Sequence, residues 1–194
     1  MSTAGVDTVG APTVASSSLT IATYDEMDIA FLSFNTLSDF DEAMALELLD
    51  VASERSAMQI VLVHWGEEYA LSHSPQQARL ARAFIDRGAD AIIGHHSHTV
   101  QDIGWYKGVP IFYSLGNFVF DQYFSDETQQ SLAVELNIVN HTVSYRLLPM
   151  SSRKHPSSPR LLPVSEQRDF LEQLAEKSHP ELATSIRERG VIEP

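Results

Sequence analysis

The stretch ADAIIGHHSH, residues 89–98, joins a short apolar run to a cluster of three histidines. Histidine is neither a strong strand former nor a common core residue, so packing alone does not explain the cluster. Neutral imidazole is a frequent protein ligand for borderline metal ions. We therefore interpret residues 91–93 as the end of a buried strand that leads metal ligands into a loop.

The residues before this stretch have the pattern of a strand–helix–strand unit. Residues 59–63 (QIVLV) contain four consecutive apolar residues, which is typical of a strand covered on both faces, and His64 follows them. SPQQ at residues 74–77 is a helix-start signature, with a capping serine, a proline in the first turn and a capping-box glutamine. The two strands of such a unit are parallel and end at the same sheet edge. The sequence therefore predicts that His64 and the later histidines share one edge.

Other segments predict an α/β fold with a mixed sheet. Hairpins are predicted at residues 18–34, 100–115 and 131–148. A helix is predicted over residues 39–56, with Ser38 or Asp39 as its cap. The apolar face of this helix is expected to contain four residues, Phe40, Met44, Leu48 and Val51.

We divide the chain into three parts. Residues 1–17 are small and polar and predict a disordered leader. Residues 18–163 form the main domain, which closes with a proline- and serine-rich strap at residues 149–163. Residues 164–194 predict a terminal helical segment, in which Pro180 interrupts the helix.

Charge and composition exclude several classes of function. The chain of 194 residues has a formal net charge of −13, and no Lys or Arg precedes Arg55. Nucleic acids and anionic membranes are therefore poor partners. The chain has no cysteine, no signal peptide and no apolar run long enough to span a membrane, so as written it is expected to be soluble and unexported. One acid-free region offers either a polyanion-binding patch or a solvated tail, and its basic residues are Arg146, Arg153, Lys154 and Arg160.

Four stretches resemble the CapA-type poly-γ-glutamate capsule biosynthesis proteins, a branch of the calcineurin-like metallophosphoesterases. They are HWGEEY at residues 64–69, SPQQ at 74–77, GADAIIGHHSH at 88–98 and YKGVPIFYSLGNFVFD at 106–121. A weaker likeness extends from about residue 18 to about residue 163. The resemblance implies a partial metallophosphoesterase-like α/β sandwich with a mixed sheet, a carboxyl-terminal helix and metals at the carboxyl ends of the strands.

The resemblance also implies a set of metal ligands. His64 and His96 would share one divalent ion, and His98 would reach toward a second. His95 is an alternative to His96, because the superfamily's glycine directly precedes its first histidine. The ion would be Zn, Mn or Fe. Asn117 and Trp65 are expected to lie in the shell around the ligands, although Trp65 is equally compatible with the core.

The superfamily takes its remaining ligands from an amino-terminal half that this sequence is expected to lack. Three imidazoles cannot bridge two metal ions, but they can hold one zinc-like ion with a position open for water. Glu67 or Glu68 could then supply a carboxylate or act as a general base, or could simply be solvated.

Two functions remain open from the sequence. The first is the carboxyl-terminal portion of a CapA-like protein of capsular poly-γ-glutamate synthesis or export, acting as a metal-dependent, phosphoesterase-like hydrolase if the site is completed. The alternative is a non-catalytic half fold that binds a polyanion or a partner protein. Possible partners are poly-γ-glutamate, capsule synthesis proteins, a complementing chain or a second copy, because a half fold would leave strand 60–63 with an uncovered face or edge. Full family members resemble membrane-associated or extracytoplasmic proteins.

Overall fold

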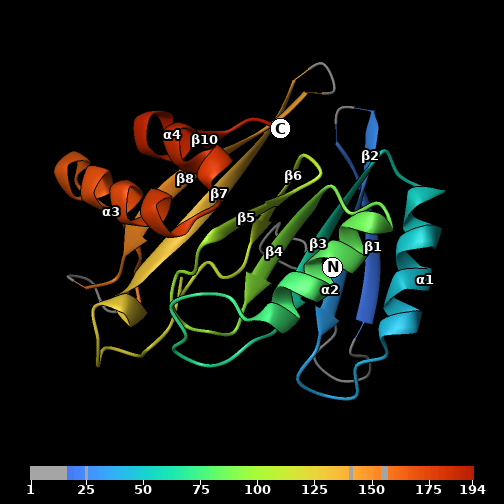
Figure 1. Ribbon diagram of the computed structural model, residues 1–194, viewed down its shortest axis with the longest axis horizontal. Coiled ribbons are helices and arrows are strands. Elements are labelled where there is room, and N and C mark those ends of the chain that lie inside the picture. Colours follow the sequence, from blue (N-terminus) through green and yellow to red (C-terminus); the bar gives the residue numbers. More distant parts are fainter. Residues whose placement is uncertain (1–16, 25, 140–141, 154–156) are drawn as a thin grey trace.

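The fold is built around a six-stranded mixed sheet (Figure 1). It is seen in a computed structural model that describes residues 17–24, 26–139, 142–153 and 157–194. The strand order is β1-β2-β3-β4-β6-β5; β2, β3, β4 and β6 run parallel, and the outer strands β1 and β5 are antiparallel to their neighbours. The strands are β1 (Ser17–Tyr24), β2 (Met27–Asn35), β3 (Met58–His64), β4 (Ala91–His95), β5 (Ile103–Tyr106) and β6 (Val109–Phe112). The predicted α/β fold with a mixed sheet is confirmed.

The predicted strand–helix–strand unit is β3, α2 (Pro75–Asp86) and β4. The side chain of Ser74 accepts a hydrogen bond from the backbone N–H of Gln77, and Gln77 Oε1 accepts one from the backbone N–H of Ser74, so the capping box forms as predicted. The parallel register places His64 opposite His95 at the carboxyl end of both strands. The local signals therefore bring two of the predicted histidines to one sheet edge.

The helix before β3 is present, but its predicted cap was wrong and its predicted buried face was only partly right: Phe40 and Leu48 pack against the core as predicted. This helix, α1, covers Glu42–Ser53 and is capped by Asp41, whose side chain accepts a hydrogen bond from Met44 N. Met44 and Val51 are 40% and 41% exposed. The residues buried against the sheet are instead Ala45, Leu49 and Ala52. Small alanines let the helix backbone approach the strands closely. A prediction based on the spacing of large apolar residues does not include these alanines.

A second sheet and two helices complete the carboxyl-terminal part. The sheet contains β7 (Gln130–Val139), β8 (Thr142–Ser151), β9 (Arg160–Leu161) and β10 (Val191–Ile192), with β8 pairing with the other three. A 3₁₀ turn (Glu127–Gln129) precedes β7. The predicted terminal helix is interrupted as expected and forms α3 (Val164–Lys177) and α4 (Pro180–Arg189). The predicted strap was partly wrong, because β8 continues to Ser151 and β9 pairs with it.

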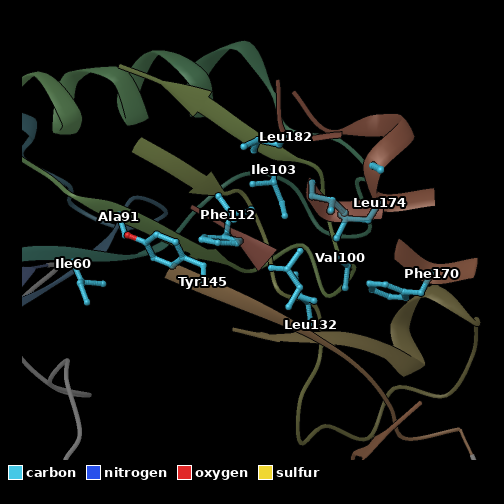
Figure 2. Close-up of a cluster of buried hydrophobic side chains, with 14 of the residues drawn as sticks. Ile60, Ala91, Val100, Ile103, Phe112, Leu132, Tyr145, Phe170, Leu174 and Leu182 are labelled. Carbon is cyan, nitrogen blue, oxygen red and sulfur yellow. The ribbon is translucent and has the colours of Figure 1, made fainter. Parts of the chain in front are cut away.

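The six-stranded sheet is covered on both faces. One core lies between the sheet and helices α1 and α2, and includes Leu32, Val61 and Phe84. The other core joins the six-stranded sheet to the second sheet and to α3 and α4; Figure 2 shows Tyr145 close to Phe112 within it. The two sheets and their outer helices thus form the expected sandwich.

The uncovered strand expected of a half fold is not found. β3 lies between β2 and β4, and its residues Ile60 and Val61, which face opposite sides, are 5% and 0% exposed. The β1–β2 hairpin supplies the neighbour that β3 needs. This prediction was wrong. The expectation of a second copy or a complementing chain rested on an uncovered β3, so the structure no longer supports that argument.

The predicted leader, residues 1–17, lies outside the described residues except for Ser17, which pairs with Phe34 at the start of β1. In the part of the chain that the structure describes, no helix is both long and apolar enough to cross a membrane.

Candidate metal centre

The candidate centre begins where β3 and β4 end. Past His95 the chain turns sharply, and His96 and His98 have φ angles of 105° and 61°. Tyr69, in the loop that follows β3, also has a positive φ, of 63°. Residues other than glycine rarely adopt such backbone conformations, which cost about 1–3 kcal/mol each and concentrate at functional sites.

These turns bring three potential ligands together. The donor atoms of Glu68, His96 and His98 all lie within 4.8 Å of one another. Glu68 Oε1 and His98 Nε2 are 3.9 Å apart. Tetrahedral donors that each lie about 2.0–2.2 Å from one ion stand about 3.3–3.6 Å apart. The group must therefore contract by up to about 1.5 Å to hold an ion, and the Glu68 side chain, 54% exposed, has room to move inward.

Asn117 fixes which nitrogen of His98 is available. The Asn117 amide nitrogen donates to Thr128 O (3.1 Å) and to Gln122 Oε1 (3.2 Å), so its Oδ1 is the acceptor 2.8 Å from His98 Nδ1. His98 Nδ1 must then carry the proton, which leaves the lone pair on Nε2, the nitrogen that faces Glu68. This is the kind of contact that orients a metal-binding histidine.

Two aromatic rings enclose His98. Tyr69 lies on one side, with the ring centroids 5.7 Å apart and nearly parallel, and Phe120 lies 5.0 Å away. Gln122 Nε2 donates to the Tyr69 hydroxyl and thereby ties Tyr69 to the loop that contains Asn117. The His98 side chain is only 17% exposed as a result.

Burial and, to a smaller extent, neighbouring imidazoles favour the neutral forms of His64 and His96. The His64 and His96 ring centroids are 4.6 Å apart, and those of His96 and His98 are 6.1 Å apart. Partial burial lowers the pKa of His64, and the charges that His96 and His98 would carry lower it further. Burial also lowers the pKa of His96, although Glu68 acts in the opposite direction. Neutral imidazole is the form that binds metal.

The loop that carries Glu68 is anchored by Gln101, which the sequence analysis did not single out. Gln101 is 1% exposed, and its Nε2 donates to the carbonyls of Ala70 and Ser72, each 3.0 Å away. Its Oε1 accepts from Gln77 Nε2 at 3.3 Å. In the sequence, the only indication of this role of Gln101 was that a polar residue stands beside a run with the pattern of a buried strand.

We predict that Gln101→Met releases this loop. The variant keeps the side-chain volume but removes the Gln101 donor to the Ser72 carbonyl and the acceptor of Gln77 Nε2, while Ala70 O keeps its bond from Thr99 Oγ1. The unfolding free energy should fall by about 1–3 kcal/mol. Metal affinity should fall by about tenfold, because Glu68 is no longer held beside the histidines. Isothermal titration with Zn²⁺ and thermal unfolding measure the two effects.

Gln59→Met is the matched control for this prediction. Gln59 is also buried and also makes two side-chain hydrogen bonds, to Ser56, but it lies near the opposite end of β3. It should lose stability and keep its metal affinity. Equal loss of affinity in both variants would show that Gln101 does not act on the site specifically.

The other predicted site residues lie around the group. Glu67 is exposed and, with Trp65, lines a neighbouring cavity of about 530 Å³. Trp65 is 1% exposed, and its Nε1 donates to Tyr113 O at 2.9 Å, so its side chain lies in the core. Only its backbone N–H reaches toward the site, donating to His95 O. His95 is exposed beside His64, and the close group contains His96 rather than His95.

The predicted polyanion patch is partly neutralised. Arg146 pairs with Glu135, and Arg153 pairs with Asp126 at 2.8 Å. Arg160 is exposed, and Lys154 lies outside the described residues. Two of the four cations of the patch therefore face acids, which reduces the positive charge that it offers to a polyanion.

Comparison with known proteins identifies similar sequences. The model of a protein family described as bacterial capsule synthesis protein PGA_cap matches residues 1–122, which include every candidate site residue. The PGA biosynthesis protein CapA of Bacillus subtilis (strain 168) is 33% identical over 168 residues, which are 83% of this chain and 44% of that protein.

Two further relatives match over shorter stretches. The capsule biosynthesis protein CapA of Bacillus anthracis is 40% identical over 112 residues, 57% of this chain and 27% of that protein. A probable polyglutamine synthesis accessory protein of Mycobacterium tuberculosis is 35% identical over 85 residues, 44% of this chain and 22% of that protein. The chain thus spans less than half the length of each of these three relatives.

Proposed function

The chain belongs to the family of bacterial capsule synthesis proteins, and from this membership we propose that it acts in the synthesis or export of capsular poly-γ-glutamate as a metal-dependent hydrolase. The similarity to a PGA biosynthesis protein and a capsule biosynthesis protein supports the pathway. The observation that supports hydrolysis is the group of Glu68, His96 and His98, in which His98 Nε2 is free and directed at the carboxylate. Its partners would be the polymer itself or other capsule synthesis proteins.

In this proposal Glu68, His96 and His98 hold one divalent ion, Zn, Mn or Fe. Two imidazoles and one carboxylate are a ligand set that zinc hydrolases use, with a position left open for water. When bound, such an ion lowers the pKa of its water and polarises the bond to be cleaved. The protein's own residues prepare for it: Asn117 holds the proton on His98 Nδ1, and Tyr69 and Phe120 restrict access of bulk water to that ring.

The adjacent glutamates provide a test of the proposal. Glu68→Gln should lower the affinity for Zn²⁺ at least about tenfold, because the ion loses its one carboxylate. Glu67→Gln removes the same charge one residue away and should bind as the native protein does, since Glu67 is not in the close group. Elemental analysis after dialysis should find one ion per chain in the native protein and in Glu67→Gln.

Hydrolysis is then measured on the metal-loaded proteins. γ-Linked glutamate oligomers and a simple phosphodiester serve as substrates, and released amine or phenol is the readout. Cleavage that a chelator stops and Glu68→Gln weakens would support the proposal. A native protein that retains no metal under any loading condition would refute the metal-dependent reaction and leave a binding role in the same pathway.

A further inference from the structure

An unusually apolar surface lies beside the candidate metal centre. Six of its side chains are between 40% and 66% exposed, and five of them come from one eight-residue segment, 117–124. We call this surface the apolar collar; it consists of Tyr69, Phe118, Val119, Phe120, Tyr123 and Phe124. Contiguous exposed apolar surface on a soluble domain commonly marks a site of interaction.

The collar is continuous with the centre. Phe124 packs edge-on against Tyr69, with centroids 5.2 Å apart, while Tyr69 and Phe120 both contact His98. Anything that covers these rings therefore also covers the side of the centre on which they lie.

The segment that presents the collar is held in place by its polar atoms. Gln129 Nε2 donates to Tyr123 O and Ser125 O, and Thr128 Oγ1 donates to Gln122 O. Ser157 Oγ donates to Phe120 O at 3.2 Å. Several polar groups of the segment are thus tied down by hydrogen bonds, while its large apolar side chains are exposed. The exposure of these rings is a fixed property of the fold.

The charge around the collar is acidic. Neither residues 65–78 nor residues 117–129 contain a Lys or Arg. Glu68 and Asp121, which directly adjoin Tyr69 and Phe120 in the sequence, are exposed. The chain has a net charge of −13. It therefore repels a second copy of itself and an anionic bilayer, and it attracts a basic surface.

We propose that the apolar collar docks a protein segment whose apolar side chains are flanked by Lys and Arg. The apolar residues of the partner cover the rings, and its cations pair with the exposed carboxylates. Bound there, the partner closes one side of the centre to solvent. The docking itself needs no metal ion, so it can be tested independently of the proposed hydrolysis.

The test uses a synthetic amphipathic helical peptide with a Leu/Phe face flanked by lysines, labelled for fluorescence anisotropy. Two control peptides are needed: one of the same composition in scrambled order, and one with glutamate in place of every lysine. The native protein should bind the lysine peptide at least tenfold more tightly than either control, in the absence and presence of Zn²⁺. Equal binding of the scrambled peptide would reduce the effect to general charge attraction and overturn the proposal.

Matched variants locate the binding surface. Phe118→Ser, Val119→Ser and Phe124→Ser together should weaken peptide binding at least tenfold, because these are the most exposed residues of the collar. The control replaces three equally exposed residues elsewhere, Val139, Leu161 and Val164, by serine and should bind as the native protein does. Thermal unfolding establishes that both variants are folded. Equal loss in both variants would contradict docking at the collar.

Two further measurements decide between occupants. Co-sedimentation with phosphatidylcholine vesicles, with and without phosphatidylglycerol, tests a lipid surface. Sedimentation velocity over a range of concentrations tests a second copy. Vesicle binding or dimerisation that the collar variant abolishes would assign the surface to that occupant and overturn the proposal, whereas a monomer that ignores both vesicles supports it.

Discussion

His98→Ala is expected to remove the metal ion from the protein. His98 supplies an imidazole nitrogen within 4.8 Å of the donor atoms of Glu68 and His96, and Asn117 directs it there. Loss of a residue that only orients a ligand costs about 10- to 100-fold in affinity, so loss of the ligand itself should cost more than about 100-fold. The measurement is ion content per chain after dialysis, followed by titration with Zn²⁺ to obtain the dissociation constant.

His95→Ala is a demanding control for this experiment. It removes an imidazole from the same histidine cluster, three residues away in sequence, yet His95 is not part of the close group. His95→Ala should keep its metal, and His96→Ala should lose it as His98→Ala does. Loss of metal from His95→Ala with retention in His96→Ala would mean that the strand end presents the other histidine to the ion.

Gly94→Ala is expected to give the largest loss of stability. Gly94 lies in β4, and a Cβ built there would overlap the carbonyl oxygen of Tyr113 and the indole nitrogen of Trp65 and lie 2.8 Å from Tyr113 C. Those two groups are hydrogen-bonded to each other at 2.9 Å. Overpacking costs about 1–3 kcal/mol and a broken buried hydrogen bond about 1–3 kcal/mol more. A loss of about 4 kcal/mol is a large share of the roughly 5–15 kcal/mol that stabilises a typical domain.

Urea unfolding followed by tryptophan fluorescence measures this effect, because Trp65 is buried at the point of overlap. Gly108→Ala is the control: Gly108 has a φ of +83°, and no atom lies within 4 Å of a Cβ built there. Its cost is limited to backbone strain, about 1 kcal/mol. Similar losses for the two variants would show that the close approach at Gly94 is relieved by movement of its neighbours.

The parts of the fold that the sequence predicts correctly are those with strong local signals. The helix-start signature at residues 74–77 and the apolar run of β3 specify neighbouring elements without reference to the rest of the chain. The buried face of α1 was predicted only in part, because it depends on which residues the sheet accepts, and Ala45 and Ala52 fit closely there. The two-residue strand β10 is defined by its pairing with β8, and no local sequence pattern predicts this contact.

The candidate site likewise has features that the sequence predicts and features that depend on the rest of the fold. The histidine cluster is visible in the sequence because three such residues together are hard to place in a core. The distinction between Glu67 and Glu68 is not visible, since it depends on the positive φ of the following residue and on Gln101, which anchors the loop from a distance in sequence. The direction of the Asn117 amide depends likewise on the carbonyl of Thr128.

The positive φ angles at His96 and His98 have a consequence for protein engineering. Glycine would adopt both conformations without strain, so each histidine is held at a position where another residue would make a more stable protein. A library of variants selected only for heat resistance would therefore tend to replace these two residues early. Selection for a thermostable form of this protein should be paired with selection for metal binding from the first round. At these two positions stability favours glycine, whereas the proposed site requires histidine.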